Sequence, residues 1–171
     1  DTAANTISSI TMSDTDVLKG ETATLTIVFS EAVAAFANAD VTCGSGSLAT
    51  MTSGDSITWA GVFTPTADTE DAVNTCDVAT SYTDTAGNAG PAGSSANYVV
   101  ETLAPSASSI TMSDVALKAG DTAILTIVFS ETVAAFASND DVSCPTGTLA
   151  VMSISSGSTW TGTFTPTDDT D

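Results

Sequence analysis

One ten-residue stretch occurs twice in the chain, as TATLTIVFSE at 22–31 and as TAILTIVFSE at 122–131. In the first copy, the apolar residues Ala23, Leu25, Ile27 and Phe29 occupy every second position, and Thr22, Thr24 and Thr26 alternate with them. This period of two is expected of a strand with one buried and one exposed face. The stretch therefore predicts a central β-strand, and its second occurrence predicts a tandem array of two similar domains.

The repeat extends well beyond this strand. Residues 1–37 align with residues 101–137 without gaps and share 24 identities. One additional residue near Asp140 then shifts the register, so that Cys43 matches Cys144 and later positions stay 101 residues apart. The two copies are thus equivalent along almost their whole shared length.

A period near 100 residues with short strands is the size of an immunoglobulin-like β-sandwich and is too long for a solenoid or propeller repeat. No segment shows a convincing helical period, so we predict an all-β fold of two tandem Ig-like sandwiches with about seven strands each. The expected domains are residues 1–101 and 102–171. In the first copy the strand candidates, bounded by Gly, Pro, Asp, Asn or Ser, are 7–12, 22–29, 40–43, 47–52, 57–63, 73–82 and 96–100.

The second copy is truncated, because Asp171 is equivalent to Glu70 and the last two strands of the repeat would follow it. A sandwich without two strands leaves open edges and half a core. We expect that the sequence is a mature fragment of a longer chain. The alternative is that a neighbouring chain supplies the strands.

The charge of the chain is strongly one-sided. Asp and Glu number 21 against only Lys19 and Lys118, with no Arg or His, and the formal net charge is -19. Nucleic acids and anionic lipids require basic partners, so binding to either is not expected. Membrane insertion is not expected either, because no run of roughly 18 apolar residues occurs. An acidic surface favours cations such as calcium, or it serves only to keep the protein soluble.

The cysteines indicate an oxidising environment. Cys43 and Cys76 fall on strand candidates that are neighbours in an Ig-like sandwich, and a disulfide between them would close a loop of about 30 residues. Such a bond points to an extracellular or cell-surface location. A thiolate metal site is a weaker alternative, because the chain has no C-x-x-C pair and no His. Cys144 repeats Cys43, and its expected partner would lie beyond Asp171.

Strand tracing gathers acidic turns at one end of the first domain, facing the second. Carboxylates crowded at such a seam repel each other unless a cation neutralises them, and calcium accepts six to eight oxygen ligands in flexible geometry. Solvated carboxylates without an ion remain the alternative. The residues expected at this seam are Asp14, Asp16, Asp68, Glu70, Asp71 and Glu101 from the first copy and Glu131 from the second.

Several stretches in order resemble the bacterial Ig-like repeats of very large surface adhesins, including those of the repeats-in-toxin type. They are SITMSD, LTIVFSEAV, FTPTAD, YTDTAGNAG, SANYVVET and the linker 101–105, ETLAP. The resemblance implies β-sandwich extender domains that project a terminal binding module from the cell, often with calcium stiffening the linkers. It places calcium ligands at Asp68, Asp84, Glu101 and Glu131, and our strand tracing adds Asp14.

The sequence does not predict an enzyme. It offers no His, no Gly-rich phosphate loop after a strand, and no nucleophile beside a plausible base. Trp59 and Phe63 lie four residues apart on one predicted strand, which indicates core packing rather than a glycan-binding surface. We therefore expect structural extender repeats whose partners are neighbouring repeats of the same chain. The alternative is a subunit of an extracellular filament or surface layer, completed by identical chains.

Overall fold

The computed structural model describes residues 3–136 and 138–167. The chain forms two compact units, of which unit 1 runs up to Leu103 and unit 2 begins at Ala104. Each unit has a hydrophobic core of its own. The division falls two residues after the boundary that the repeat places at residue 101.

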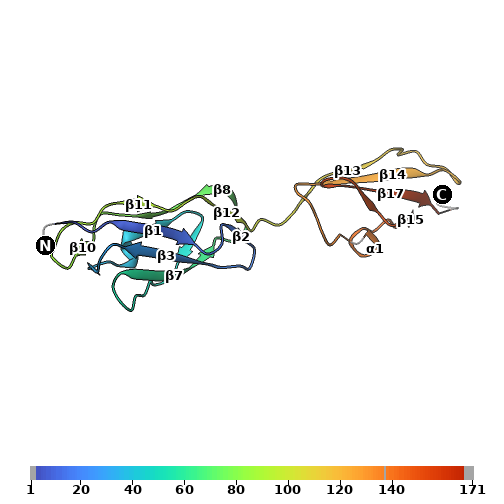
Figure 1. Ribbon diagram of the computed structural model, residues 1–171. Coiled ribbons are helices and arrows are strands. Elements are labelled where there is room, and N and C mark those ends of the chain that lie inside the picture. Colours follow the sequence, from blue (N-terminus) through green and yellow to red (C-terminus); the bar gives the residue numbers. More distant parts are fainter. Residues whose placement is uncertain (1–2, 137, 168–171) are drawn as a thin grey trace. The chain divides into compact units, whose positions relative to one another are not determined.

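The repeated stretch forms β3 (Ala23–Phe29), an inner strand of a four-stranded sheet in unit 1. Its side chains alternate between buried and outward positions, as the period of two predicts. β1 (Ile7–Met12) and β7 (Thr58–Pro65) pair with its two edges in antiparallel register, and Ile27 lies opposite Trp59. Figure 1 shows these three strands side by side in unit 1. The strand prediction is confirmed.

The other layer of unit 1 consists of two short three-stranded sheets that close the sandwich, with a two-stranded pair at one end. The first sheet is β5 (Val41–Cys43), β9 (Cys76–Val78) and β11 (Gly93–Ser94), and the second is β8 (Glu70–Asn74), β12 (Tyr98–Glu101) and β2 (Asp16–Leu18). The remaining elements of unit 1 are β4 (Val33–Ala34), which pairs with β10 (Thr83–Asp84), β6 (Gly46–Leu48) at the edge of the first layer, and a 3₁₀ turn at Asn38–Asp40.

β2 lies where the sequence analysis expected only a turn between the first two strands. It pairs in parallel with β12, so that Val17 is opposite Val100, and both side chains are fully buried. Three residues are too few to show a period, and the partner strand lies about eighty residues further along the chain. The strand is therefore a product of tertiary pairing rather than of local sequence.

Aromatic side chains connect the two layers of unit 1. Phe63 and Tyr98 meet edge to face with their ring centroids 5.1 Å apart, and both are fully buried. Tyr82 packs against Phe29 at 5.1 Å. The Tyr82 hydroxyl donates to the Pro91 carbonyl and the Tyr98 hydroxyl donates to the Gly44 carbonyl, which satisfies these polar atoms inside the core.

Unit 2 repeats the first layer of unit 1 with the same register. Leu125 lies opposite Gly162 as Leu25 lies opposite Gly61. The all-β prediction is confirmed. The strands of this sheet are β13 (Ala107–Met112), β14 (Ala123–Phe129), β17 (Thr159–Pro166) and β15 (Gly147–Leu149), and β16 (Ser153–Ser156) also pairs with β17.

The described residues of unit 2 form no second sheet that packs over this one. The one-turn helix α1 (Ser138–Asp141) and an irregular segment, 142–146, occupy the positions of the 3₁₀ turn and β5 of unit 1. Neither β5 nor β2 has a counterpart strand in the described part of unit 2, because both pair in unit 1 with strands from residues 70–103. Unit 2 therefore presents one open face of its sheet.

Candidate functional site

A disulfide joins Cys43 and Cys76 within one sheet of unit 1, as the sequence analysis predicts. The two residues lie opposite each other on β5 and β9, and Cys76 is fully buried. The bond closes a loop between two residues that are 33 positions apart in the sequence. The equivalent residue of unit 2, Cys144, has a free and partly exposed thiol.

Asp84 is buried in the turn that carries the DTAGN sequence. Its Oδ1 accepts hydrogen bonds from the backbone N–H groups of Ala86 and Asn88 at 2.9 and 2.8 Å, and its Oδ2 accepts one from Asn88 Nδ2 at 2.7 Å. These donors, with the Asn88 side chain foremost, lower the pKa of Asp84. The Asp84 carboxylate therefore stabilises its own turn. The sequence analysis, which predicted Asp84 only as a calcium ligand, did not anticipate this role.

Glu101 and Glu70 face each other across β12 and β8 at the end of unit 1 from which the chain leaves toward Leu103. The nearby turn between β7 and β8 contains Asp68, whose backbone adopts a left-handed conformation with φ of 52°. Thr102 fixes this end, because its buried hydroxyl donates to the Thr66 carbonyl at 2.7 Å. The structure thus places Asp68, Glu70 and Glu101 at one end of unit 1.

Asp14 does not belong to this end of unit 1, and Glu131 is part of unit 2. Asp14 accepts a hydrogen bond from the Asp16 N–H at 3.0 Å just before β2, and the parallel register places Leu18, not Asp14, opposite Glu101. Glu131 belongs to unit 2 and follows Ser130, whose N–H donates to the Ser106 carbonyl at 2.8 Å near the start of that unit. Asp14 is therefore about four strand residues away from Glu101.

No three acidic, histidine or cysteine side chains gather closely enough to hold a metal ion in the described ranges 3–136 and 138–167. Calcium also accepts backbone carbonyls and water, so pairs of carboxylates can contribute to a site without forming such a group. Calcium binding by Asp14, Asp68, Asp84, Glu101 and Glu131 stays a prediction.

The aromatic residues belong to the core, in agreement with the sequence analysis. Trp59 is partly buried and packs edge to face on Phe36 at 5.1 Å, and Trp160 makes the same contact with Phe136 in unit 2. Among the described residues, no helix is both long and apolar enough to cross a membrane.

The sequence analysis missed the residues that hold the second layer of unit 1 in place. Tyr98 and Thr102 are each buried and hydrogen-bonded to a backbone carbonyl, and neither interaction follows from strand periodicity. Their only signal in the sequence was their place near the end of the repeat. Both anchor the segment 70–103, which covers the core of unit 1.

Two facing layers with a core of alternating strand residues define the first unit as an Ig-like β-sandwich, and unit 2 repeats its first layer. The bacterial Ig-like domain family matches the chain in two consecutive segments, residues 1–100 and 101–171. The chain belongs to this family.

Among solved structures, the chain is similar to that of FdeC, an adhesin of Escherichia coli. The two share 15% sequence identity with a TM-score of 0.44, over 96% of this chain and 57% of that chain. The chain thus spans little more than half the length of that structure. No curated protein matches the sequence.

Proposed function

We propose that this chain is a pair of structural repeats from a bacterial cell-surface adhesin, in which Ig-like units space a binding module from the cell. The observation that carries the proposal is the match of the bacterial Ig-like family to two consecutive segments that together cover the chain. A tandem array of this kind serves reach and spacing, because each unit folds around its own core. The repeats themselves catalyse no reaction.

The disulfide supports the extracellular part of this proposal. Cys43 and Cys76 are bonded across neighbouring strands, and such bonds persist in oxidising environments. The net charge of -19 supports it as well, since an acidic surface keeps an extended array soluble and is repelled by the anionic groups of a cell envelope.

The spacer role is tested by exchanging the repeats in the full-length protein for an unrelated Ig-like pair of the same length. A spacer keeps its function in this exchange, so adhesion of intact cells should persist, whereas deletion of the pair should reduce it. Surface display is measured in parallel with an antibody to another part of the protein. Loss of adhesion after exchange, with display unchanged, would show that these repeats bind the target themselves.

We also propose that calcium binds at the end of unit 1 near Glu101 and stiffens the chain there. The pairing of Glu101 with Glu70 and the nearby Asp68 support this, because two adjacent carboxylates repel each other in the absence of a cation. Backbone carbonyls and water would complete the coordination.

Calcium binding is measured by titration calorimetry on the whole chain and on a Glu101→Gln variant, with Asp55→Asn as the matched control in a turn that joins β6 to β7. Binding should be lost in the first variant and kept in the control. Small-angle scattering should report a greater length with calcium than with chelator. Equal lengths in the two conditions would refute the stiffening.

A further inference from the structure

The charged residues of the chain are distributed unevenly over its sheets. No strand of the four-stranded sheet of unit 1 or of the five-stranded sheet of unit 2 contains Asp, Glu or Lys. The strands of the three-stranded sheets of unit 1, by contrast, carry Asp16, Glu70, Asp71, Asp77 and Glu101. In a chain with a net charge of -19, the strands of the first layer are therefore uncharged.

β1 lies at one edge of the four-stranded sheet, and one side of its backbone is free. Among the described residues, β1 pairs only with β3. The N–H of Ser13, just beyond β1, donates to the Thr24 carbonyl of β3 at 2.9 Å. Successive N–H groups of a strand point alternately to its two sides, so the N–H and C=O groups of Ile10 and Met12 point away from β3. They face a position where a further strand can pair.

The rest of the repeat does not occupy this edge. Unit 1 includes every strand up to β12, and the later strands that it contains pair in other sheets or on the far side of β3. β1 also contains no charged residue and no proline, the usual protections of an edge strand. The opposite edge is better protected, because β6 has only three residues and the Asn38 side chain donates to the Leu48 and Ala49 carbonyls at 3.0 Å.

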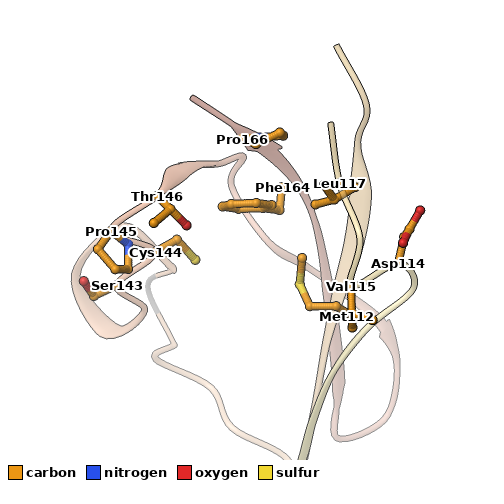
Figure 2. A pocket seen from close by; sticks show the side chains of 10 residues that line it. All are labelled: Met112, Asp114, Val115, Leu117, Ser143, Cys144, Pro145, Thr146, Phe164 and Pro166. Atoms are coloured by element: carbon orange, nitrogen blue, oxygen red, sulfur yellow. The ribbon is translucent and has the colours of Figure 1, made fainter. Parts of the chain in front are cut away.

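Unit 2 has the same edge at β13. Residues 108–112 repeat the SSITM sequence of residues 8–12, and in the described part of unit 2 β13 pairs only with β14. Figure 2 shows the Met112 side chain directed into the pocket that Phe164 also lines. Thr111, the preceding residue, therefore points to the outer face of the sheet. The free, uncharged edge is thus a feature of both repeats.

We propose that this edge pairs in antiparallel fashion with the same edge of a second copy of the chain, with the twofold axis at Thr11. Ile10 and Met12 both lie in the regular part of β1, after the irregularity between Ile7 and Ser9. Pairing Ile10 of one copy with Met12 of the other uses the outward groups of both residues, and the symmetry forms each pair twice. This inference concerns the edge alone and does not depend on the adhesin role.

Charge favours a second copy of this edge as the partner. Two chains of net charge -19 repel each other, and the repulsion is weakest where the strands of both are uncharged. A basic partner would instead be attracted to the acidic strands of the second layer. The main-chain hydrogen bonds require only another extended strand, and the proposed register places the exposed Thr11 opposite Thr11 of the second copy. Threonine pairs in such positions stabilise a sheet.

The pairing would join two four-stranded sheets into one continuous sheet. A single contact of this kind is weak, because it consists of few hydrogen bonds between short strands. Since both repeats carry the edge, one contact raises the effective concentration of the next. We therefore expect association to strengthen with the number of repeats.

Disulfide trapping tests the register directly. Opposite residues of a non-hydrogen-bonded antiparallel pair have Cα atoms about 4.5 Å apart, which a disulfide can span. The whole chain with Thr11→Cys and Cys144→Ser should therefore form a covalent dimer in a glutathione redox buffer. The matched control is Thr58→Cys in the same background, because Thr58 is exposed on the same face but lies on the inner strand β7. The control should stay monomeric. A Thr11→Cys chain that dimerises no more than the control would overturn the proposal.

Amide hydrogen exchange of the whole chain gives a second measurement that needs no added thiol. The Ile10 and Met12 amides should exchange more slowly as the protein concentration rises. Thr11→Glu should abolish this concentration dependence, because it places two like charges directly opposite each other, whereas Thr58→Glu should preserve it. Loss in both variants would show that the copies stack through their faces, and exchange independent of concentration in the native chain would show that the edge binds no second copy. Either result would overturn the proposal.

Discussion

Cys43 and Cys76 lie directly opposite each other on β5 and β9, and a disulfide joins them across this pair. β5 is only three residues long. Three residues of strand would hold this pairing only weakly, and the covalent bond fixes it. The bond also attaches residues 70–103, which contain Cys76, to the rest of unit 1.

Removing this bond should destabilise unit 1. The paired substitution Cys43→Ala and Cys76→Ala frees a loop of 33 residues, and the free energy of unfolding should fall by about 3–4 kcal/mol. The measurement is urea denaturation followed by the fluorescence of Trp59 in a Trp160→Phe background. Cys144→Ser is the control and should leave the unit 1 midpoint in place, whereas an unchanged midpoint in the paired variant would contradict the expectation.

Stability in acid should depend on the turn at Asp84. Its folded pKa is lowered by the Asn88 side chain and by backbone N–H donors, so its contribution is present above the ordinary pKa near 3.8 and is lost as pH falls through the folded value. Asp84→Asn should therefore unfold more easily than the native chain at neutral pH, and the difference should shrink below pH 3.8. Thermal melts over this range test it, with the exposed Asp16→Asn as control. A gap that persists in strong acid would show that the charge is not the cause.

Stability in alkali should depend on the two tyrosines, both of which lie in unit 1. Burial raises the pKa of Tyr82 and of Tyr98 from 10.0 to about 12, so the folded state keeps its protons where the unfolded chain loses them. Unit 1 should lose stability between pH 10 and 12. Tyrosinate absorbance and Trp59 fluorescence should change together. Ionisation near pH 10 without unfolding would mean that the hydroxyls reach solvent.

Equivalent phenylalanines should differ in their contribution. Phe63 is fully buried against Tyr98, and Phe63→Ala should cost unit 1 about 3–5 kcal/mol through lost burial and a cavity. Phe164 is 8% exposed and lines a pocket of about 530 Å³, so Phe164→Ala should cost unit 2 less than this. Denaturation is followed by Trp59 for the first and by Trp160 for the second, each in a background without the other tryptophan. Equal losses would indicate that the face of unit 2 is covered in solution.

The sequence alone predicted the parts of the fold that have a local signal. Alternation along 22–29 identified β3, and the spacing of Cys43 and Cys76 on neighbouring strands identified the disulfide. β2 was missed because three residues carry no period and its partner β12 is remote in sequence.

The candidate site was harder to predict for a physical reason. The sequence around a loop carboxylate does not distinguish whether the carboxylate faces solvent, an ion or its own backbone. Only the structure shows that Asp84 accepts three hydrogen bonds within its turn. Conversely, the pairing of Glu101 with Glu70 follows from the register of β12 and β8, which includes an irregularity between Tyr98 and Val100 that no sequence pattern indicates.

The disulfide of unit 1 also sets how far the chain can lengthen under tension. If a pulling force unfolded unit 1, the 33 residues between Cys43 and Cys76 would stay closed as a loop. An extended residue spans about 3.3–3.6 Å, so the closed loop keeps roughly 110 Å of contour length from contributing to the extension of the chain. An intact bond would therefore make each unfolding event a short step, and the tether would recoil from a smaller extension when the force is released.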